Sequence, residues 1–139
     1  MQIKFWITLN EPWVQSLHGY GDGSKAPGIL GVGDKAYIAA HNQIRAHAKA
    51  YRVYENEFAA TQNGQVGITL NTEWAEPEDP NDPTHVEAAD TNMQFFLGWF
   101  MHPIYVDGGY PEVMREKVRN NKQQVAFIRH SNCPELNSR

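Results

Sequence analysis

The chain has 139 residues, about the size of one average domain, and 41% of them are hydrophobic and 20% charged. This balance is ordinary for a globular domain and argues against a disordered or fibrous chain. The formal net charge of −4 lacks the positive excess that nucleic-acid binding needs, and no apolar run approaches the ~18 residues of a membrane span. A single cysteine, Cys133, excludes an internal disulfide framework and a thiolate metal cluster.

The first half of the chain predicts a strand, a long loop and a helix. Bulky and β-branched residues over 3–9 predict a strand that ends at Asn10-Glu11-Pro12, and its early start predicts no signal peptide. Residues 13–33 are rich in glycine and predict a loop, which is unusually long for a compact domain unless it is functional. A helix is predicted over 34–58. Its expected buried stripe has alternating spacings of four and three residues: Tyr37, His41, Ile44, Ala48, Tyr51 and Phe58.

The second half repeats this order of elements. Residues 66–71 predict a strand, and the acidic, proline-rich residues 73–83 predict a loop. Thr84 and Glu87 have the spacing of a capping box, which predicts a helix from Thr84 to about Met101.

Strands that alternate with helices predict an α/β fold with parallel strands and helices packed outside them. Both predicted strands are apolar on both faces, as strands covered on both sides should be. Trp6 and Trp99 are expected to fill the core between strands and helices. Two strands cannot close a sheet, and a complete α/β barrel needs eight, so we expect this chain to be part of a larger domain.

Phe5 to Pro12 resembles the Trp-x-Thr-x-Asn-Glu-Pro signature of family 1 glycoside hydrolases, the β-glucosidase family. Further motifs follow in the order that this family shows: Gly19-Tyr20-Gly21 with Ala26-Pro27-Gly28, Ala39 to Ala48, Gly67 to Asn71, Gly98 to Pro103, and Gly109-Tyr110-Pro111. Two other segments, Trp74 to Pro77 and Glu87 to Asp90, look most like the animal lactase-phlorizin hydrolase and lactase-like branch. Residues 1–119 carry the resemblance, and residues 120–139 only a weak one, so residues 1–139 are expected to be a partial catalytic domain.

The resemblance implies a fragment of a (β/α)8 TIM barrel that covers roughly strands 4 and 5 with their helices. It also implies a retaining glycosidase that needs no metal or organic cofactor and acts on a β-glycoside. Glu11 matches the general acid/base, and Asn10 matches the residue that binds the sugar 2-hydroxyl. The family's nucleophile lies in a Thr-Glu-Asn-Gly motif, and no Glu-Asn-Gly occurs in this chain. The chain alone is therefore expected to be inactive.

Four further residues are candidates for substrate binding. Val14 and His18 fall where family members line the aglycone entrance, Asn71 ends the second predicted strand, and Trp74 could stack on an aglycone ring. Each also has a plainer interpretation, because a loop histidine is more often only at the surface and Trp74 could merely cover the barrel rim. The remaining histidines suggest no metal pair, since His41 and His47 are six residues apart in the helix.

Three interpretations of function stay open. The first is a segment of a hydrolase of β-glucosides or β-galactosides. The second is a non-catalytic, klotho-like binding or co-receptor protein. Against it, Asn10-Glu11-Pro12 is intact, whereas such proteins often lose a catalytic carboxylate. The third is a truncated product without function.

Overall fold

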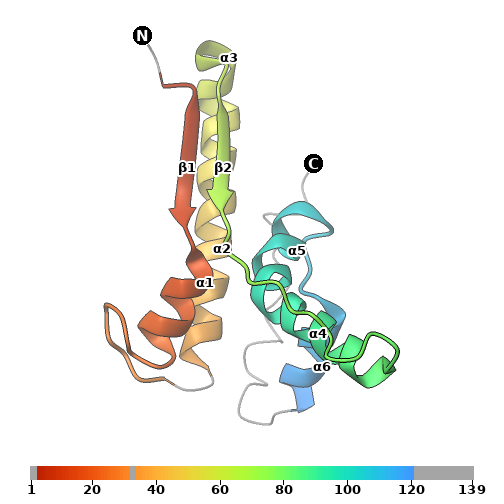
Figure 1. The fold of residues 1–139 in the computed structure, drawn as a ribbon. Coiled ribbons are helices and arrows are strands. Elements are labelled where there is room, and N and C mark those ends of the chain that lie inside the picture. Colours follow the sequence, from red (N-terminus) through yellow and green to blue (C-terminus); the bar gives the residue numbers. More distant parts are fainter. Residues whose placement is uncertain (1–2, 32–33, 121–139) are drawn as a thin grey trace.

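A parallel pair of strands forms the centre of the computed structural model, which describes residues 3–31 and 34–120. Strand β1 (Phe5–Asn10) lies beside β2 (Gln65–Thr69), with Phe5 opposite Gln65. Helix α2 (Lys35–Val53) runs along one face of this sheet (Figure 1). The parallel pairing confirms the prediction from the strand–helix alternation. The predictions for residues 121–139, including Cys133, lie outside the described residues.

The segment after β1 is helical at its start, which the sequence did not indicate. Helix α1 (Pro12–Val14) continues into a π-helical turn, η1 (Gln15–Gly19), so the predicted loop over 13–33 is wrong for its first residues. The physical reason is that Pro12 occupies the first helical position, where its fixed φ suits helix initiation and its missing N–H costs nothing. Helix α1 therefore begins only two residues after the last residue of β1, Asn10.

The long helix has about the predicted length, but only part of its predicted apolar stripe is buried. After α2 the chain continues through a π-helical turn, η2 (Tyr54–Phe58), into α3 (Ala59–Gln62). Ile44 and Ala48 are buried as expected, whereas Tyr51 and Phe58 are exposed. The two-stranded sheet offers too little surface to cover the far end of the helix, and this is why the stripe is buried only over the middle of α2.

The remaining helices gather beyond the carboxyl ends of the strands (Figure 1). The predicted second helix is present as three successive parts: α4 (Pro83–Met93), a π-helical turn η3 (Gln94–Gly98) and α5 (Trp99–Tyr105). Helix α6 (Glu112–Asn120) follows after a turn. No helix within residues 3–31 and 34–120 has both the length and the apolar content needed to cross a bilayer.

Helix α4 begins at Pro83, one residue before the predicted start, and its N-cap lies two residues before Thr84. The carboxylate of Asp82 accepts a hydrogen bond from the backbone N–H of Thr84 at 2.8 Å, and Pro83 takes the first helical position. The cap is therefore Asp82, and Thr84 already lies inside the helix. The motif was ambiguous because Asp82, Pro83 and Thr84 are all residues that favour a helix start.

This correction can be tested by substitution. Asp82→Ala should lower the free energy of unfolding by about 1 kcal/mol, because it leaves a backbone N–H of the first turn without its acceptor. Thr84→Ala should change it much less, and this variant is the matched control. Urea unfolding followed by circular dichroism would compare the two. A larger loss for Thr84→Ala would show that the capping box forms after all.

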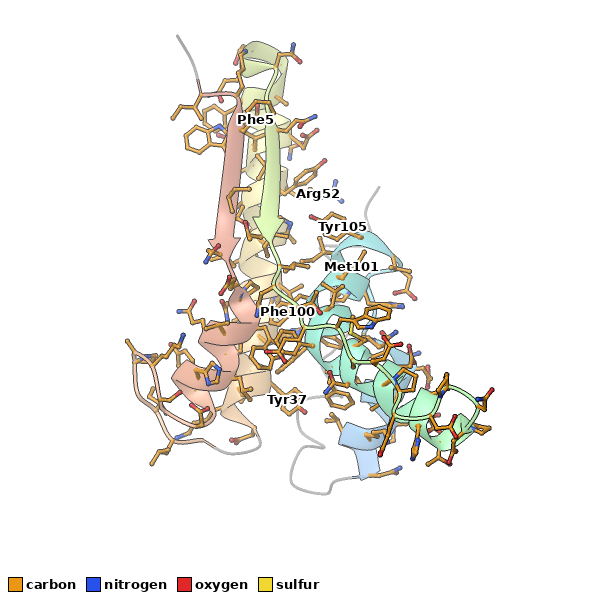
Figure 2. All side chains as sticks on the ribbon, in the orientation of Figure 1. Phe5, Tyr37, Arg52, Phe100, Met101 and Tyr105 are labelled. Carbon is orange, nitrogen blue, oxygen red and sulfur yellow. The ribbon has the colours of Figure 1, made fainter. Side chains whose placement is uncertain are left out.

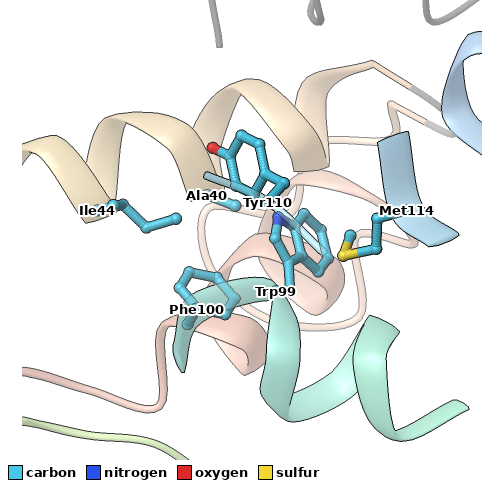
Figure 3. Packing of buried hydrophobic residues seen from close by; sticks show 6 residues of the cluster. All are labelled: Ala40, Ile44, Trp99, Phe100, Tyr110 and Met114. Carbon is cyan, nitrogen blue, oxygen red and sulfur yellow. The ribbon is translucent and has the colours of Figure 1, made fainter. Parts of the chain in front are cut away.

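The hydrophobic core lies between α2 and α5. Figure 3 shows six of its buried residues packed together: Ala40, Ile44, Trp99, Phe100, Tyr110 and Met114. Trp99 is buried as predicted, but among helices rather than between strands and helices. Trp6 is not buried, since it is 42% exposed, and Phe5 (labelled in Figure 2) and Ile7 are exposed as well. The reason is that, among the described residues, β1 pairs only with β2 and its apolar side chains have too few neighbours to cover them.

Candidate active site

Glu11 lies at the point where β1 ends and α1 begins. Its backbone N–H donates to the carbonyl oxygen of Thr69 at 2.9 Å, and this bond ties Glu11 to the carboxyl end of β2. Its φ of 48° and ψ of 60° place it in the left-handed region. A residue with a Cβ in this region costs on the order of 1–3 kcal/mol, and strained residues of this kind cluster at functional sites. The strain identifies Glu11 as a candidate functional residue independently of any motif.

Helix α2 holds the segment that follows Glu11. Pro12 and Ser16 are fully buried, and the side-chain amide of Gln43 donates to the hydroxyl oxygen of Ser16 at 2.8 Å. The same amide also lies 3.4 Å from the carbonyl oxygen of Pro12. One side chain of α2 therefore holds both the first residue of α1, Pro12, and Ser16 in the turn that follows it.

Trp13 joins the Glu11 segment to the second half of the chain. Its ring stacks on Phe96 of η3, with ring centroids 3.9 Å apart and planes at 12°. Its indole N–H donates to the carbonyl oxygen of Phe95 at 3.3 Å. We did not predict this role, because no local pattern indicates which of the chain's aromatic residues will meet across such a distance. The contact makes the position of Glu11 depend on η3 as well as on α2.

Two asparagines belong to the same edge of the sheet as Glu11. Asn10 pairs with Thr69, and Asn71 follows two residues after Thr69. Parallel strands end at one edge, so both residues lie at that edge. Among the described residues, Asn71 Oδ1 is buried without a hydrogen-bond partner. Such an acceptor is costly to leave unsatisfied, and it is available to accept a hydrogen bond from a further polar group.

Val14 and His18 both lie in the helical segment that follows Glu11, and both are half-buried. His18 Nδ1 lies 2.8 Å from Asp22 Oδ2, and the His18 ring meets the Trp13 ring edge-on with centroids 5.7 Å apart. The pKa of Asp22 is lowered to about 2, chiefly because its carboxylate accepts hydrogen bonds from the backbone N–H and the hydroxyl of Ser24, with a further bond to His18. The histidine ring is thus held by an ionised carboxylate.

Trp74 lies apart from these contacts, in the segment between β2 and α4. Its side chain is 77% exposed, and its indole N–H donates to the carboxylate of Glu76. The structure brings Asn10, Glu11 and Asn71 to one sheet edge and Val14 and His18 to the adjoining helix, whereas the hydrogen bond of Trp74 goes to Glu76, outside that group.

The helix histidines have separate partners. His41 Nδ1 lies 2.8 Å from the hydroxyl oxygen of Tyr110, and His47 Nδ1 lies 2.8 Å from that of Thr8. Within residues 3–31 and 34–120, no three His, Cys, Asp or Glu side chains are grouped closely enough to hold a metal ion.

Comparison with known proteins decides the family. The model of glycosyl hydrolase family 1 matches residues 1–138. This chain belongs to that family. It is 47% identical over 136 residues to the lactase/phlorizin hydrolase of Rattus norvegicus, and 44% identical over 117 residues to the lactase-like protein of Mus musculus. The family and the lactase-like branch indicated by the motifs are both confirmed.

The chain is short relative to these family 1 proteins. The alignment covers 97% of the chain but 7% of the rat lactase/phlorizin hydrolase. Klotho of Rattus norvegicus is also similar, at 41% identity over 92% of the chain and 13% of its own length.

Solved structures of β-glucosidases resemble the fold of this chain. The β-glucosidase of Trichoderma harzianum gives a TM-score of 0.78 at 39% identity, over 91% of this chain and 28% of that one. An aphid myrosinase gives 0.83 at 35% identity, over 89% of this chain and 26% of that one. The described residues are thus a mixed helix–strand portion of a larger barrel fold.

Proposed function

We propose that this chain is a segment of a retaining β-glycosidase in which Glu11 is the general acid/base. In this proposal β1 and β2 are strands 4 and 5 of an eight-stranded barrel, with residues 1–119 as the well-matched part of the catalytic domain. The observation that carries the proposal is the placement of Glu11, with a strained backbone, at the carboxyl end of a parallel strand. In α/β barrels the working side chains lie at that end of the strands.

Glu11 would first donate its proton to the glycosidic oxygen while a second carboxylate, about 5–5.5 Å away, attacks the anomeric carbon. The bond to the leaving group breaks, and the sugar is held as a covalent glycosyl-enzyme. Glu11, now ionised, would take a proton from a water molecule that attacks the anomeric carbon and releases both the sugar and the nucleophile. Asn10 would bind the sugar 2-hydroxyl, a contact that strengthens in the transition state.

The second carboxylate would come from another part of the barrel. Glu73 and Glu76 follow β2 closely in sequence, but both are exposed, and Glu76 is already bonded to Trp74. Asn71 would contribute its unpaired oxygen to the site, Val14 and His18 would line the aglycone side, and Trp74 would stay at the rim. The substrate class is a β-glucoside or β-galactoside, and hydrolysis by this route uses no metal or organic cofactor.

The similarity to Klotho favours a second candidate, a non-catalytic binding protein. The two candidates differ at Glu11. A binding role gives no reason to keep a carboxylate in a strained backbone at the strand end. Acid catalysis, in contrast, requires a carboxyl group at this position. Retention of Asn10-Glu11-Pro12 therefore supports the glycosidase.

The test is a chimera, called here the barrel chimera, in which residues 1–119 replace the matching segment of the Trichoderma harzianum β-glucosidase. We expect the barrel chimera to hydrolyse aryl β-glucosides or β-galactosides, and the isolated 139-residue chain to show no hydrolysis above background. A folded barrel chimera that lacks activity, with the intact parent active in the same assay, would contradict the proposal and favour the binding protein.

A further inference from the structure

The two strands slip by one residue just before Asn10 and Glu11. Ile7 lies opposite Gly67 and Asn10 lies opposite Thr69, so three steps along β1 match two steps along β2. An extra residue in one strand bends it and re-aims the side chains that follow, and such irregularities are frequent beside active sites. The direction in which Glu11 leaves the sheet therefore depends on what holds this slip.

Thr8 lies inside the slipped segment and makes two hydrogen bonds there. Its hydroxyl donates to the carbonyl oxygen of Gly67 at 3.1 Å, and the same oxygen lies 2.8 Å from Nδ1 of His47. His47 comes from α2 and is only 5% exposed. One hydroxyl thus joins β1, β2 and α2 at the point where the strand register changes.

The direction of these bonds follows from the number of hydrogens. A threonine hydroxyl has one hydrogen; when it is donated to Gly67, the Thr8 oxygen is left to accept from His47, and this arrangement assigns the Nδ1-protonated tautomer. Burial lowers the pKa of His47, because the charged ring would lose its hydration, and the ring is therefore neutral at neutral pH.

We propose that Thr8 and His47 are positioning residues for Glu11, and that the hydrogen bonds from His47 Nδ1 to Thr8 and from Thr8 to Gly67 hold the strand slip that aims its carboxyl group. The proposal rests on the acid/base role of Glu11. Neither residue touches the sugar, because Thr8 faces α2, on the side of the sheet where the helix packs. Without these bonds the end of β1 can shift, and a displacement of about 1 Å at a reacting group can cost on the order of a hundredfold in rate.

A pair of substrates separates this role from a purely structural one. In the barrel chimera, kcat/KM is measured for phenyl β-glucoside, whose leaving group needs protonation, and for 2,4-dinitrophenyl β-glucoside, whose leaving group departs without it. Thr8→Val keeps the shape of the side chain but removes the hydroxyl. We expect it to lower kcat/KM for the phenyl glucoside roughly tenfold more than for the dinitrophenyl glucoside. The measured ratio is kcat/KM for the phenyl glucoside divided by kcat/KM for the dinitrophenyl glucoside. Thr8→Ser, which keeps the hydroxyl, should restore this ratio to that of the unsubstituted barrel chimera.

His47 offers a matched pair of variants. His47→Asn places an amide nitrogen where Nδ1 lies and should preserve the ratio between the two substrates. His47→Gln fills the same space but places its nitrogen near the position of Nε2, and should lower the ratio as Thr8→Val does. Thermal unfolding of each variant confirms that folded proteins are compared. Because the Thr8 pair and the His47 pair test the proposal independently, one pair still tests it if a variant of the other fails to fold.

Three results would overturn the inference. An equal loss for both substrates would indicate a structural role only, and no loss in either pair would show that the bonds do not aim Glu11. If Thr8→Val lowers the ratio as much in a barrel chimera that already carries Glu11→Gln as in the unsubstituted one, Thr8 acts through a group other than Glu11. The effect of Glu11→Gln separates the inference from the proposed function. If Glu11→Gln leaves the ratio unchanged, the acid/base assignment fails. If Glu11→Gln lowers the ratio and Thr8→Val does not, only the positioning role of Thr8 fails.

Discussion

Replacing Glu11 by glutamine in the barrel chimera should lower kcat/KM for phenyl β-glucoside by about 10²–10⁴, the range in which general acid catalysis contributes to rates. Glutamine has nearly the shape of glutamate but cannot donate an acidic proton to the glycosidic oxygen. The first step with 2,4-dinitrophenyl β-glucoside should change little, because dinitrophenolate leaves without protonation. The comparison is made by steady-state kinetics with both substrates.

The loop carboxylates supply the control for this result. Glu73 and Glu76 are exposed and follow the neighbouring strand, so Glu73→Gln and Glu76→Gln should leave both substrates within a few-fold of the unsubstituted barrel chimera. A loss that is equal for the two substrates in Glu11→Gln would contradict the acid role. A larger loss in Glu76→Gln than in Glu11→Gln would move the assignment to the loop.

The strand end that carries Glu11 could be predicted because its signals are local. Pro12 cannot continue a strand, so the strand must end before it, and this puts Glu11 at the carboxyl end whatever surrounds it. Parallel pairing follows from the alternation of strands and helices, and it brings Asn71 to the same edge. The structure agrees on both points: β1 ends at Asn10, and β2 ends two residues before Asn71.

The contacts that hold Glu11 in place could not be predicted, because they join residues far apart in sequence. Trp13 donates to a carbonyl 82 residues away, and Thr8 bonds to Gly67 across a strand slip that has no sequence signature. The burial of His47 depends on where α2 crosses the sheet, which the helical period alone does not define. Periodicity also failed for Tyr51, because a stripe is buried only where a neighbour exists to cover it.

These long-range contacts suggest how the strain at Glu11 is supported. A residue with a Cβ stays in the left-handed backbone region only where the surrounding structure excludes conformations of lower energy. On one side, the bond from its own N–H to Thr69 and the slip held by Thr8 define the strand end. On the other side, Trp13 is stacked on Phe96. Glu11 lies between two anchored segments, so its backbone cannot relax without breaking one of them.

The core beneath these anchors gives the largest expected effect on stability. Phe100 is 1% exposed and packs with Ile44 and Trp99 between α2 and α5 (Figure 3). Phe100→Ala should lower the free energy of unfolding by about 3–5 kcal/mol, because it removes a buried ring and leaves a cavity that the helices fill only partly. Urea unfolding of the barrel chimera, followed by tryptophan fluorescence and circular dichroism, would measure the loss.

The adjacent residue is the matched control. Met101 is 43% exposed, so Met101→Ala should cost well under half as much as Phe100→Ala, although it shortens a side chain of the same helix. Similar losses for the two variants would show that α5 does not pack on α2 through Phe100. Because η3 leads directly into α5, a loosened core should also weaken the stacking of Trp13 on Phe96. Phe100→Leu, which keeps most of the apolar volume, should therefore retain more hydrolysis of phenyl β-glucoside than Phe100→Ala when folded proteins are compared.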